Sequence, residues 1–381
     1  MSDETARLQP AALTAAEGSP AGSAAGFPPG LPEPLTDPAA WRGPEVLAEA
    51  NWLQTLSEAE LTELHAAALP WLARVEQDSA ALNALDRDSF SLPLLGPRLA
   101  ALADELQRGR GFALLRGLPV ASWGRRCSAV AFYGLGAHLG RPRPQNAQGH
   151  LLGHVRDLGL RADDPAVRIY QTHERQSFHT DSCDIVGLLC LQTARAGGES
   201  ALVSSVTLYN ELRARRPDLA ALLFQPLATD RRGEVPADAK PYFEIPVFNW
   251  HQGCFAAIYQ RQYVNSSQRF ADAPRLSAAQ VEALDLLDSL ANDPTLNLRM
   301  ALAPGDLQFV HNHRLLHDRM AFEDWPEPAG RRYLLRLWLA PEDAQALPPV
   351  YARRYGNVVP GQRGGVALAG VAGVMPLPEQ A

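Results

Sequence analysis

The stretch VRIYQTHERQSFHTDSCDIVGLLCLQ, residues 167–192, holds two short apolar runs on either side of a polar segment. The first run is VRIYQ at 167–171 and the second is IVGLLCLQ at 185–192. Apolar runs of this length between polar residues predict β-strands. Comparable runs follow along the chain: SALVS at 200–204, KPYFEIPVF at 240–248, CFAAIYQ at 254–260, LNLRMAL at 296–302, DLQFVHN at 306–312 and RYLLRLWL at 332–339. Many short strands separated by turn residues are typical of a β-sandwich or jelly roll, which we expect here.

Helices are predicted on both sides of the first strands. Apolar residues recur with helical spacing up to residue 74, and Ser57 followed by Glu58 and Glu60 predicts a helix N-terminus there. Further helices are expected at 95–108, 122–139, 206–215 and 277–292, with a strand at 112–116. The fold class predicted is therefore α+β, with a jelly-roll core flanked by helices.

Composition divides the chain into four parts. Residues 1–38 are rich in Ala, Gly, Pro and Ser, and are expected to form a disordered N-terminal arm. Residues 39–104 are expected to form a helical segment that packs on the core. Residues 105–345 form the main domain, with a helical insertion at about 205–295, and residues 346–381 form a C-terminal extension rich in Gly, Pro and Ala.

The charge and cysteine content exclude several classes of protein. The 381-residue chain has a formal net charge of -7 and no basic stripe, which argues against a nucleic-acid binder. No apolar run approaches the length of a membrane span, and the N-terminus lacks the pattern of a secretory signal. The four cysteines form no CxxC pair, which argues against a zinc ribbon. We therefore expect a cytoplasmic protein that acts on a small molecule.

The segment SFHTD contains a candidate metal site. On extended backbone, side chains two residues apart lie on one face, so His179 and Asp181 can reach the same ion. A third ligand must come from elsewhere, and NHRLLH at 312–317 offers His317, with His311 and His313 as competitors. Two histidines and one carboxylate on one face of an octahedron leave open positions, which is typical of iron(II) oxygenases.

A second signal is a pair of arginines on the last predicted strand. In RYLLRLWL, Arg332 and Arg336 are four residues apart and therefore lie on the same face. A buried guanidinium needs an anionic partner, and its planar fork suits a carboxylate. The alternative is two rim arginines that pair with local acids such as Glu323 or Asp324.

With these motifs the sequence resembles the taurine dioxygenase-like (TauD/TfdA) family of iron(II)- and 2-oxoglutarate-dependent dioxygenases. The resemblance covers roughly residues 105–340 and rests on an ordered set of short motifs: HTD at 179–181, GGES at 197–200, GD at 305–306, NHRLLH at 312–317 and RRYLLR at 331–336. It implies a distorted double-stranded β-helix, which is a variant of the jelly roll. It also implies Fe(II), with 2-oxoglutarate and O2 as cosubstrates, and hydroxylation of a small, anionic organic substrate with release of succinate and CO2.

The resemblance assigns roles to individual residues. His179, Asp181 and His317 match the iron ligands, and Asn312, five residues before the distal histidine, favours His317 over its competitors. Arg332 matches the residue that binds the far carboxylate of 2-oxoglutarate. Ser200 lies where the family often has a threonine that supports that carboxylate, and Arg336 lies where some members bind the anionic group of the substrate. The resemblance is also compatible with a homo-oligomer.

Two further polar residues are candidates for the substrate pocket. Gln171 and His173 precede the metal pair, and counting by twos from His179 places them on its face if the strand is unbroken.

Two alternative functions remain at the level of sequence. One is a cupin-like metal enzyme that does not use 2-oxoglutarate, for which the presence of Arg332 and Ser200 would have no explanation. The other is a non-catalytic jelly-roll binding protein, which would be expected to lack a metal ligand or the arginine.

Overall fold

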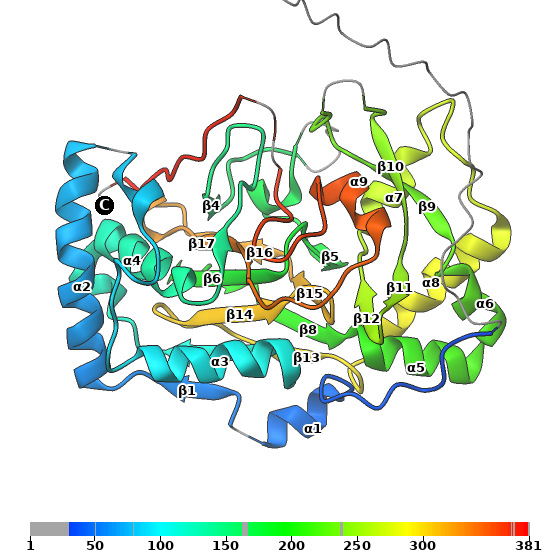
Figure 1. Cartoon of the computed structure of the whole chain (residues 1–381), viewed down its shortest axis with the longest axis horizontal. Coiled ribbons are helices and arrows are strands. Elements are labelled where there is room, and N and C mark those ends of the chain that lie inside the picture. The colour runs from blue at the N-terminus through cyan, green and yellow to red at the C-terminus, as the bar shows by residue number, and fades with distance from the viewer. Residues whose placement is uncertain are drawn as a thin grey trace, which may run out of the picture. The chain divides into compact units, whose positions relative to one another are not determined.

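The computed structural model describes residues 30–49, 51–78, 80–161, 167–236, 239–366, 368 and 370–379. Contacts divide the chain between Gly30 and Leu31, and every helix and strand among the described residues belongs to the unit Leu31–Ala381 (Figure 1). Most of the arm predicted at 1–38 lies outside the described residues. This unit has a mixed α+β architecture, in which strands dominate from residue 176 onward.

A seven-stranded sheet forms one half of the strand-rich region. Its order is β1-β2-β14-β6-β17-β3, and β4 also pairs with β17. All pairs are antiparallel except the parallel pair β1 and β2. The strands are β1 (Leu53–Thr55), β2 (Phe112–Arg116), β3 (Arg141–Pro142), β4 (Leu152–Val155), β6 (Ile185–Gln192), β14 (Leu307–His311) and β17 (Tyr333–Ala340).

A four-stranded antiparallel sheet forms the other half, with the order β13-β8-β15-β5. Its strands are β5 (Gln176–His179), β8 (Ser200–Ser204), β13 (Leu298–Met300) and β15 (Leu315–Arg319). Along two stretches of the chain the strands of the two sheets alternate: β4, β5, β6 and β8 in the first, and β13, β14, β15 and β17 in the second. A short pair, β7 (Ala196–Gly197) with β16 (Phe322–Glu323), joins the turns at one end.

Three helices cover the seven-stranded sheet. They are α2 (Glu58–Gln77), α3 (Gly96–Arg108) and α4 (Val120–Ala137). Helix α4 packs on β6 and β17, α2 packs on α4, and α3 contacts β2 and β14. Ser57 is the N-cap of α2, as predicted, and it also forms a capping box with Glu60. A large apolar cluster fills the space between these helices and the sheet.

The insertion at about 205–295 contains strands as well as helices. Its helices are α5 (Ser205–Arg215), α6 (Pro217–Leu222), α7 (Arg261–Ser267) and α8 (Ala278–Asn292). Between α6 and α7 lie two hairpins, which are made of β9 (Pro226–Asp230) with β10 (Tyr242–Pro246), and β11 (Phe248–His251) with β12 (Cys254–Ala257). These elements lie together on the side of the four-stranded sheet (Figure 1), and α5, α6 and α8 share a second apolar cluster with them.

Both ends of the described chain pack on this framework. Residues 31–38, which were expected to belong to the arm, lie against α5, where Leu35 N donates to Asn210 Oδ1 at 2.8 Å. The helix α1 (Gly43–Ala48) follows and contacts β13. The C-terminal extension contains the short helix α9 (Ala352–Tyr355) and buries Arg363 completely.

One predicted strand is wrong. VRIYQ at 167–171 does not extend, because Ile169–Gln171 forms the 3-10 helix η2, and residues 172–175 form a bend before β5 begins. Thr172 Oγ1 donates to Ile169 O at 2.9 Å, a local bond that competes with strand pairing.

Candidate metal centre and adjoining cavities

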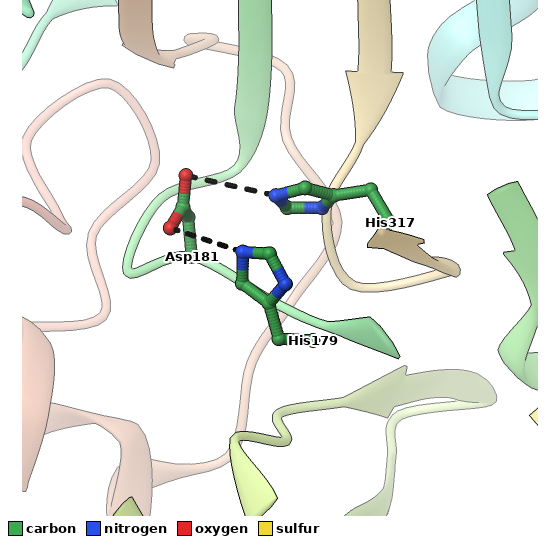
Figure 2. Close-up of side chains that lie close together, drawn as sticks. All are labelled: His179, Asp181 and His317. Atoms are coloured by element: carbon green, nitrogen blue, oxygen red, sulfur yellow. Dashed lines mark ion pairs between the residues drawn. The ribbon is translucent and has the colours of Figure 1, made fainter. Parts of the chain in front are cut away.

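Three side chains that are distant in sequence converge on one point. One nitrogen each of His179 and His317 and one oxygen of Asp181 lie within 4.8 Å of one another (Figure 2). The Asp181 carboxylate is 3.9 Å from His179 Nε2 through Oδ1 and 3.8 Å from His317 Nε2 through Oδ2. This arrangement provides two neutral nitrogen donors and one anionic oxygen donor, which is the donor set of a mononuclear iron(II) site.

The two histidines meet because they are cross-strand partners. His179 ends β5, and His317 is its direct partner on the antiparallel strand β15. Side chains of directly opposed residues lie on the same face of a sheet, which here brings the ring centroids to 4.1 Å. Asp181 lies just beyond the end of β5, so it is not held by the strand geometry that the HxD pattern suggested.

Burial keeps the histidines in the form that binds metals. It lowers the pKa of His317 to about 3, and the neighbouring His179 adds to this lowering. Burial also lowers the pKa of His179, whose Nδ1 lies 2.8 Å from Ser177 O and whose Nε2 lies 2.8 Å from the side-chain amide nitrogen of Gln176. With the proton on Nδ1 toward Ser177 O, Nε2 keeps the lone pair that a metal ion would use. Both rings are therefore neutral at physiological pH.

The carboxylate of Asp181 is held in its ionised form. Burial alone would raise the pKa of Asp181, but the charge of Arg336 and the hydrogen bond from Trp338 are among the effects that outweigh it and lower the pKa to about 2. Oδ2 accepts hydrogen bonds from Arg336 at 3.0 Å and from the Trp338 indole at 2.8 Å. Two donors on one oxygen fix the orientation of the carboxylate.

Asn312 positions the loop that carries Asp181. Its Oδ1 accepts from Asp181 N at 2.7 Å, and its Nδ2 donates to Asp181 O at 2.7 Å and to Cys183 O at 2.8 Å. Asn312 is completely buried in the turn between β14 and β15. The same turn leads to His317, so one amide couples both parts of the metal centre.

We expect Asn312→Ala to weaken Fe(II) binding about 10- to 100-fold, because it releases the loop of a ligand without removing any ligand. Anaerobic Fe(II) titration measures this affinity, and unfolding by urea shows whether the change is only a loss of stability. Asn210→Ala, which removes another side-chain amide bonded to backbone atoms, is the matched control. Equal Fe(II) affinity in wild type and Asn312→Ala would show that the loop needs no such support.

The competing histidines serve another purpose. His313 is completely buried, and its Nε2 lies 3.0 Å from Asp184 Oδ1. Arg363 of the C-terminal extension donates to the same carboxylate, at 2.7 Å from NH2. His311 is also buried, and neither ring belongs to the converging set. This polar network fixes the C-terminal extension against the loop that follows Asp181.

A cavity of about 490 Å³, including its opening to solvent, borders the metal centre. His179 and His317 lie on its wall together with Ser200, Arg319, Arg332 and Arg336. Arg332 and Arg336 therefore share one face of the last strand, as predicted. The rim-arginine alternative does not apply, because both arginines are buried, and Asp324 accepts from the backbone amide of Arg332 at 2.7 Å.

Two guanidinium groups in this cavity lack a full set of partners. NH1 of Arg319 and NH1 of Arg332 are buried and have no hydrogen-bond partner among the described residues. Burial lowers the pKa of Arg319 to about 9 and that of Arg332 to about 10, and the charge of Arg332 adds to the effect at Arg319. Both remain cations near neutral pH, so an anion in this cavity would satisfy them.

The GGES and β15 segments shape this anion site. Gly198 has φ +78, and a Cβ there would lie 3.0 Å from Arg332 Nε, so the glycine leaves room for the arginine. Ser200 is the direct cross-strand partner of Arg319. Phe322 lies beneath both guanidinium groups, 4.8 Å from Arg319 and 5.1 Å from Arg332.

A second cavity, of about 800 Å³ including its opening, lies on the other side of Asp181. Arg336 and Trp338 line it on the metal side, and Arg336 borders both cavities. Its Nε donates to Gln145 at 2.8 Å, while its NH1 contacts Asp181. The opposite wall comes from β9, β10 and α7, which belong to the insertion.

The structure brings neither Gln171 nor His173 to the wall of either of these two cavities. His173 pairs with Asp157 at 3.3 Å, and its side chain is 59% exposed. Gln171 accepts from Arg168 N through its side chain. Counting by twos fails here because η2 and the following bend interrupt the strand.

Among the polar residues of the two cavities that were not predicted from the sequence are Gln176, Arg168, Arg319 and Arg354. Arg319 could have been found, because it lies two residues after His317 on the same strand. The others depend on contacts between distant segments.

Two sheets with a two-histidine, one-carboxylate centre between cavities define a mononuclear non-haem iron oxygenase. The model of the "Taurine catabolism dioxygenase TauD, TfdA family" matches residues 77–338. The chain is 32% identical over 322 residues to FR-33289 synthase of Streptomyces rubellomurinus, which covers 82% of this chain and 92% of that protein. It is also 32% identical to the taurine hydroxylase-like protein SAT17 of Stachybotrys chartarum, which covers 82% of each.

Solved structures show the same fold. An asparagine oxygenase, determined with Fe(II), 3-hydroxyasparagine and succinate, covers 76% of this chain and 93% of its own with a TM-score of 0.59 at 17% identity. The chain belongs to the TauD, TfdA family, and it is an Fe(II)- and 2-oxoglutarate-dependent dioxygenase. No described helix combines the length and the apolar character needed to cross a bilayer.

Proposed function

We propose that His179, Asp181 and His317 hold Fe(II), and that the cavity beside them receives 2-oxoglutarate. The observation that carries this proposal is the position of the converging ligands next to two buried, incompletely bonded guanidinium groups. We further propose that the two sheets are the two sides of a distorted double-stranded β-helix, since the main strands from β4 to β8 and from β13 to β17 alternate between them.

The residues of the smaller cavity would orient the cosubstrate. Arg332 and Arg319 would bind its far carboxylate, with the Ser200 hydroxyl as a further donor. The near carboxylate and keto oxygen would then point toward the histidines. Fe(II) with bound 2-oxoglutarate supplies the oxidising chemistry, which consumes O2 and releases succinate and CO2.

The larger cavity would hold the organic substrate that is hydroxylated. Arg336 and Trp338 separate it from the cosubstrate and, through their hydrogen bonds, keep the Asp181 carboxylate facing the metal. The apolar walls exclude water from the reacting C–H bond. Asp181 supplies a carboxylate at this ligand position, and this supports hydroxylation as the reaction.

The test is an anaerobic titration of the purified protein with Fe(II) and 2-oxoglutarate, monitored by the visible charge-transfer absorption of the chelate. We expect this absorption in wild type with 2-oxoglutarate, and much weaker development with 2-oxopentanoate, which has the same chain length but lacks the far carboxylate. Equal titration curves for the two acids would contradict the assignment of the guanidinium pair. Absence of absorption with either acid would contradict the proposed metal and cosubstrate site.

A further inference from the structure

The wall of the larger cavity carries two arginines to which neither the metal nor the cosubstrate site assigns a role. Arg168 precedes η2, and Arg354 belongs to α9 in the C-terminal extension. Their side chains are 19% and 7% exposed, and both line the cavity. Arg354 Nε donates to Ser182 Oγ at 2.8 Å, one residue after the metal ligand Asp181.

A single carboxylate holds these two arginines together. Glu234 Oε2 contacts NH2 of Arg168 and lies 3.3 Å from NH2 of Arg354. Because both guanidinium groups approach one oxygen atom, their ends are close enough to contact one further small group. Glu234 is buried but is not among the residues of the cavity wall, so it supports the pair from behind.

The charges around the larger cavity do not cancel. Arg168 and Arg354 share Glu234, while Arg336 contacts Asp181. Asp230 also lines the cavity, but Arg269 and Ser266 hold its carboxylate. Asp181 would also neutralise part of the charge of the bound metal. The far carboxylate of 2-oxoglutarate would bind the guanidinium groups of the smaller cavity, so it would not neutralise the arginines of the larger one. The side chains around the larger cavity therefore leave one net positive charge, which lies on the arginine pair.

The insertion makes one part of the wall apolar and aromatic, and the remaining wall adds uncharged polar side chains: Gln145, Gln176, Thr180, Ser182, Thr229 and Gln260. Leu227, Phe243, Ile245, Val247 and Val264 come from the insertion and face the cavity. Tyr263 accepts a hydrogen bond from Arg168 at 2.5 Å and adds a flat ring beside the arginine pair. Such a wall suits an uncharged organic body and offers no carboxylate for an ammonium group, since those present are already paired.

We propose that the substrate carries a doubly charged phosphate monoester or phosphonate group, bound between Arg168 and Arg354, with an apolar body against the β9–β10 wall. Two guanidinium groups that converge on one point favour one compact dianion over two separated carboxylates. A zwitterionic amino acid is disfavoured because its ammonium group would lie near the same two cations. The proposal deepens the proposed function and rests on it for the position of the metal.

Binding of matched probes to the protein loaded with Fe(II) and saturating 2-oxoglutarate tests this under anaerobic conditions. Phenylphosphonate at pH 8 is the dianion, benzenesulfonate the tetrahedral monoanion, phthalate the dicarboxylate, phenylalanine the zwitterion and benzamide the neutral probe. Calorimetry should show phenylphosphonate binding at least about tenfold more tightly than each of the others. If Fe(II) and 2-oxoglutarate form their chelate normally but phenylphosphonate binds no more tightly than the other probes, only the present inference is overturned. If the chelate does not form, the proposed function is overturned.

Substitutions with opposite expected signs separate charge recognition from structural support. Arg168→Met and Arg354→Met should each weaken phenylphosphonate binding at least about 30-fold and leave the chelate absorption and benzamide binding unchanged. Glu234→Gln keeps the shape but removes the negative charge behind the pair, so it should tighten phenylphosphonate binding about threefold. Arg98→Met, which breaks an arginine–glutamate pair between α2 and α3, is the control and should change nothing.

Two results would overturn the assignment of this anion site. The first is unchanged phenylphosphonate binding in both arginine variants. The second is weaker phenylphosphonate binding in Glu234→Gln. If Arg168, Glu234 and Arg354 were only a structural ion triad, removing the charge of any one of them would weaken binding. The glutamine variant decides the question if the arginine variants fail to fold.

Discussion

His317→Ala should lose Fe(II) affinity by at least about 1,000-fold and show no chelate absorption, because changes outside the ligand set alone cost about 10- to 100-fold. The variant leaves His179 and Asp181 3.9 Å apart with no third donor, so the ion would have only two protein ligands. The measurement is anaerobic titration with Fe(II) in the presence of 2-oxoglutarate, followed by assay of succinate release.

The control is a histidine elsewhere in the same fold. His65 lies on α2 and stacks on Trp123 at a centroid distance of 4.5 Å, and His65→Ala should bind Fe(II) as wild type does. We expect His317→Ala to keep the wild-type fold. Burial already keeps this ring neutral, so no charge is lost, and its Nδ1 has no hydrogen-bond partner among the described residues. Chelate absorption that persists in His317→Ala would show that the metal binds elsewhere.

The sequence predicted that His179 and Asp181 lie close together, but it did not predict the reason for their geometry. Alternation along a strand suggested that His179 and Asp181 share a face, whereas the strand ends at His179 and Asn312 holds Asp181 in place. The choice of His317 over His311 and His313 needed the resemblance to the family. The structure adds the cause, since His317 is the cross-strand partner of His179, and His313 lies against Asp184.

The arginines of the two cavities also differ in whether they could be predicted from the sequence. Arg332 and Arg336 were found because Arg336 lies on β17 and Arg332 directly precedes it on extended chain, where a spacing of four residues gives the same face. Arg168 was not predicted, because its segment has the composition of a strand. The residues that follow it form a 3-10 helix instead. Its partners Glu234 and Arg354 come from an insertion loop and the C-terminal extension, and no local pattern relates such segments.

Arg332→Met should raise the apparent dissociation constant of 2-oxoglutarate about 30- to 4,000-fold, the range for removing one partner of a buried, hydrogen-bonded charge pair. Arg332 is 5% exposed and its NH1 has no partner among the described residues, so the cosubstrate carboxylate would be its main anionic contact. Arg319→Met should have a smaller effect in the same direction, because Arg319 NH2 already donates to Ile169 O at 3.2 Å.

The comparison with 2-oxopentanoate isolates this contact from any general damage to the site. That acid lacks the far carboxylate, so its affinity in Arg332→Met should equal its affinity in wild type, while the affinity for 2-oxoglutarate falls toward the same value. If both acids lose affinity equally, Arg332 supports the cavity rather than the carboxylate. If neither loses affinity, the buried guanidinium serves another anion, and the cosubstrate must bind with its far carboxylate elsewhere.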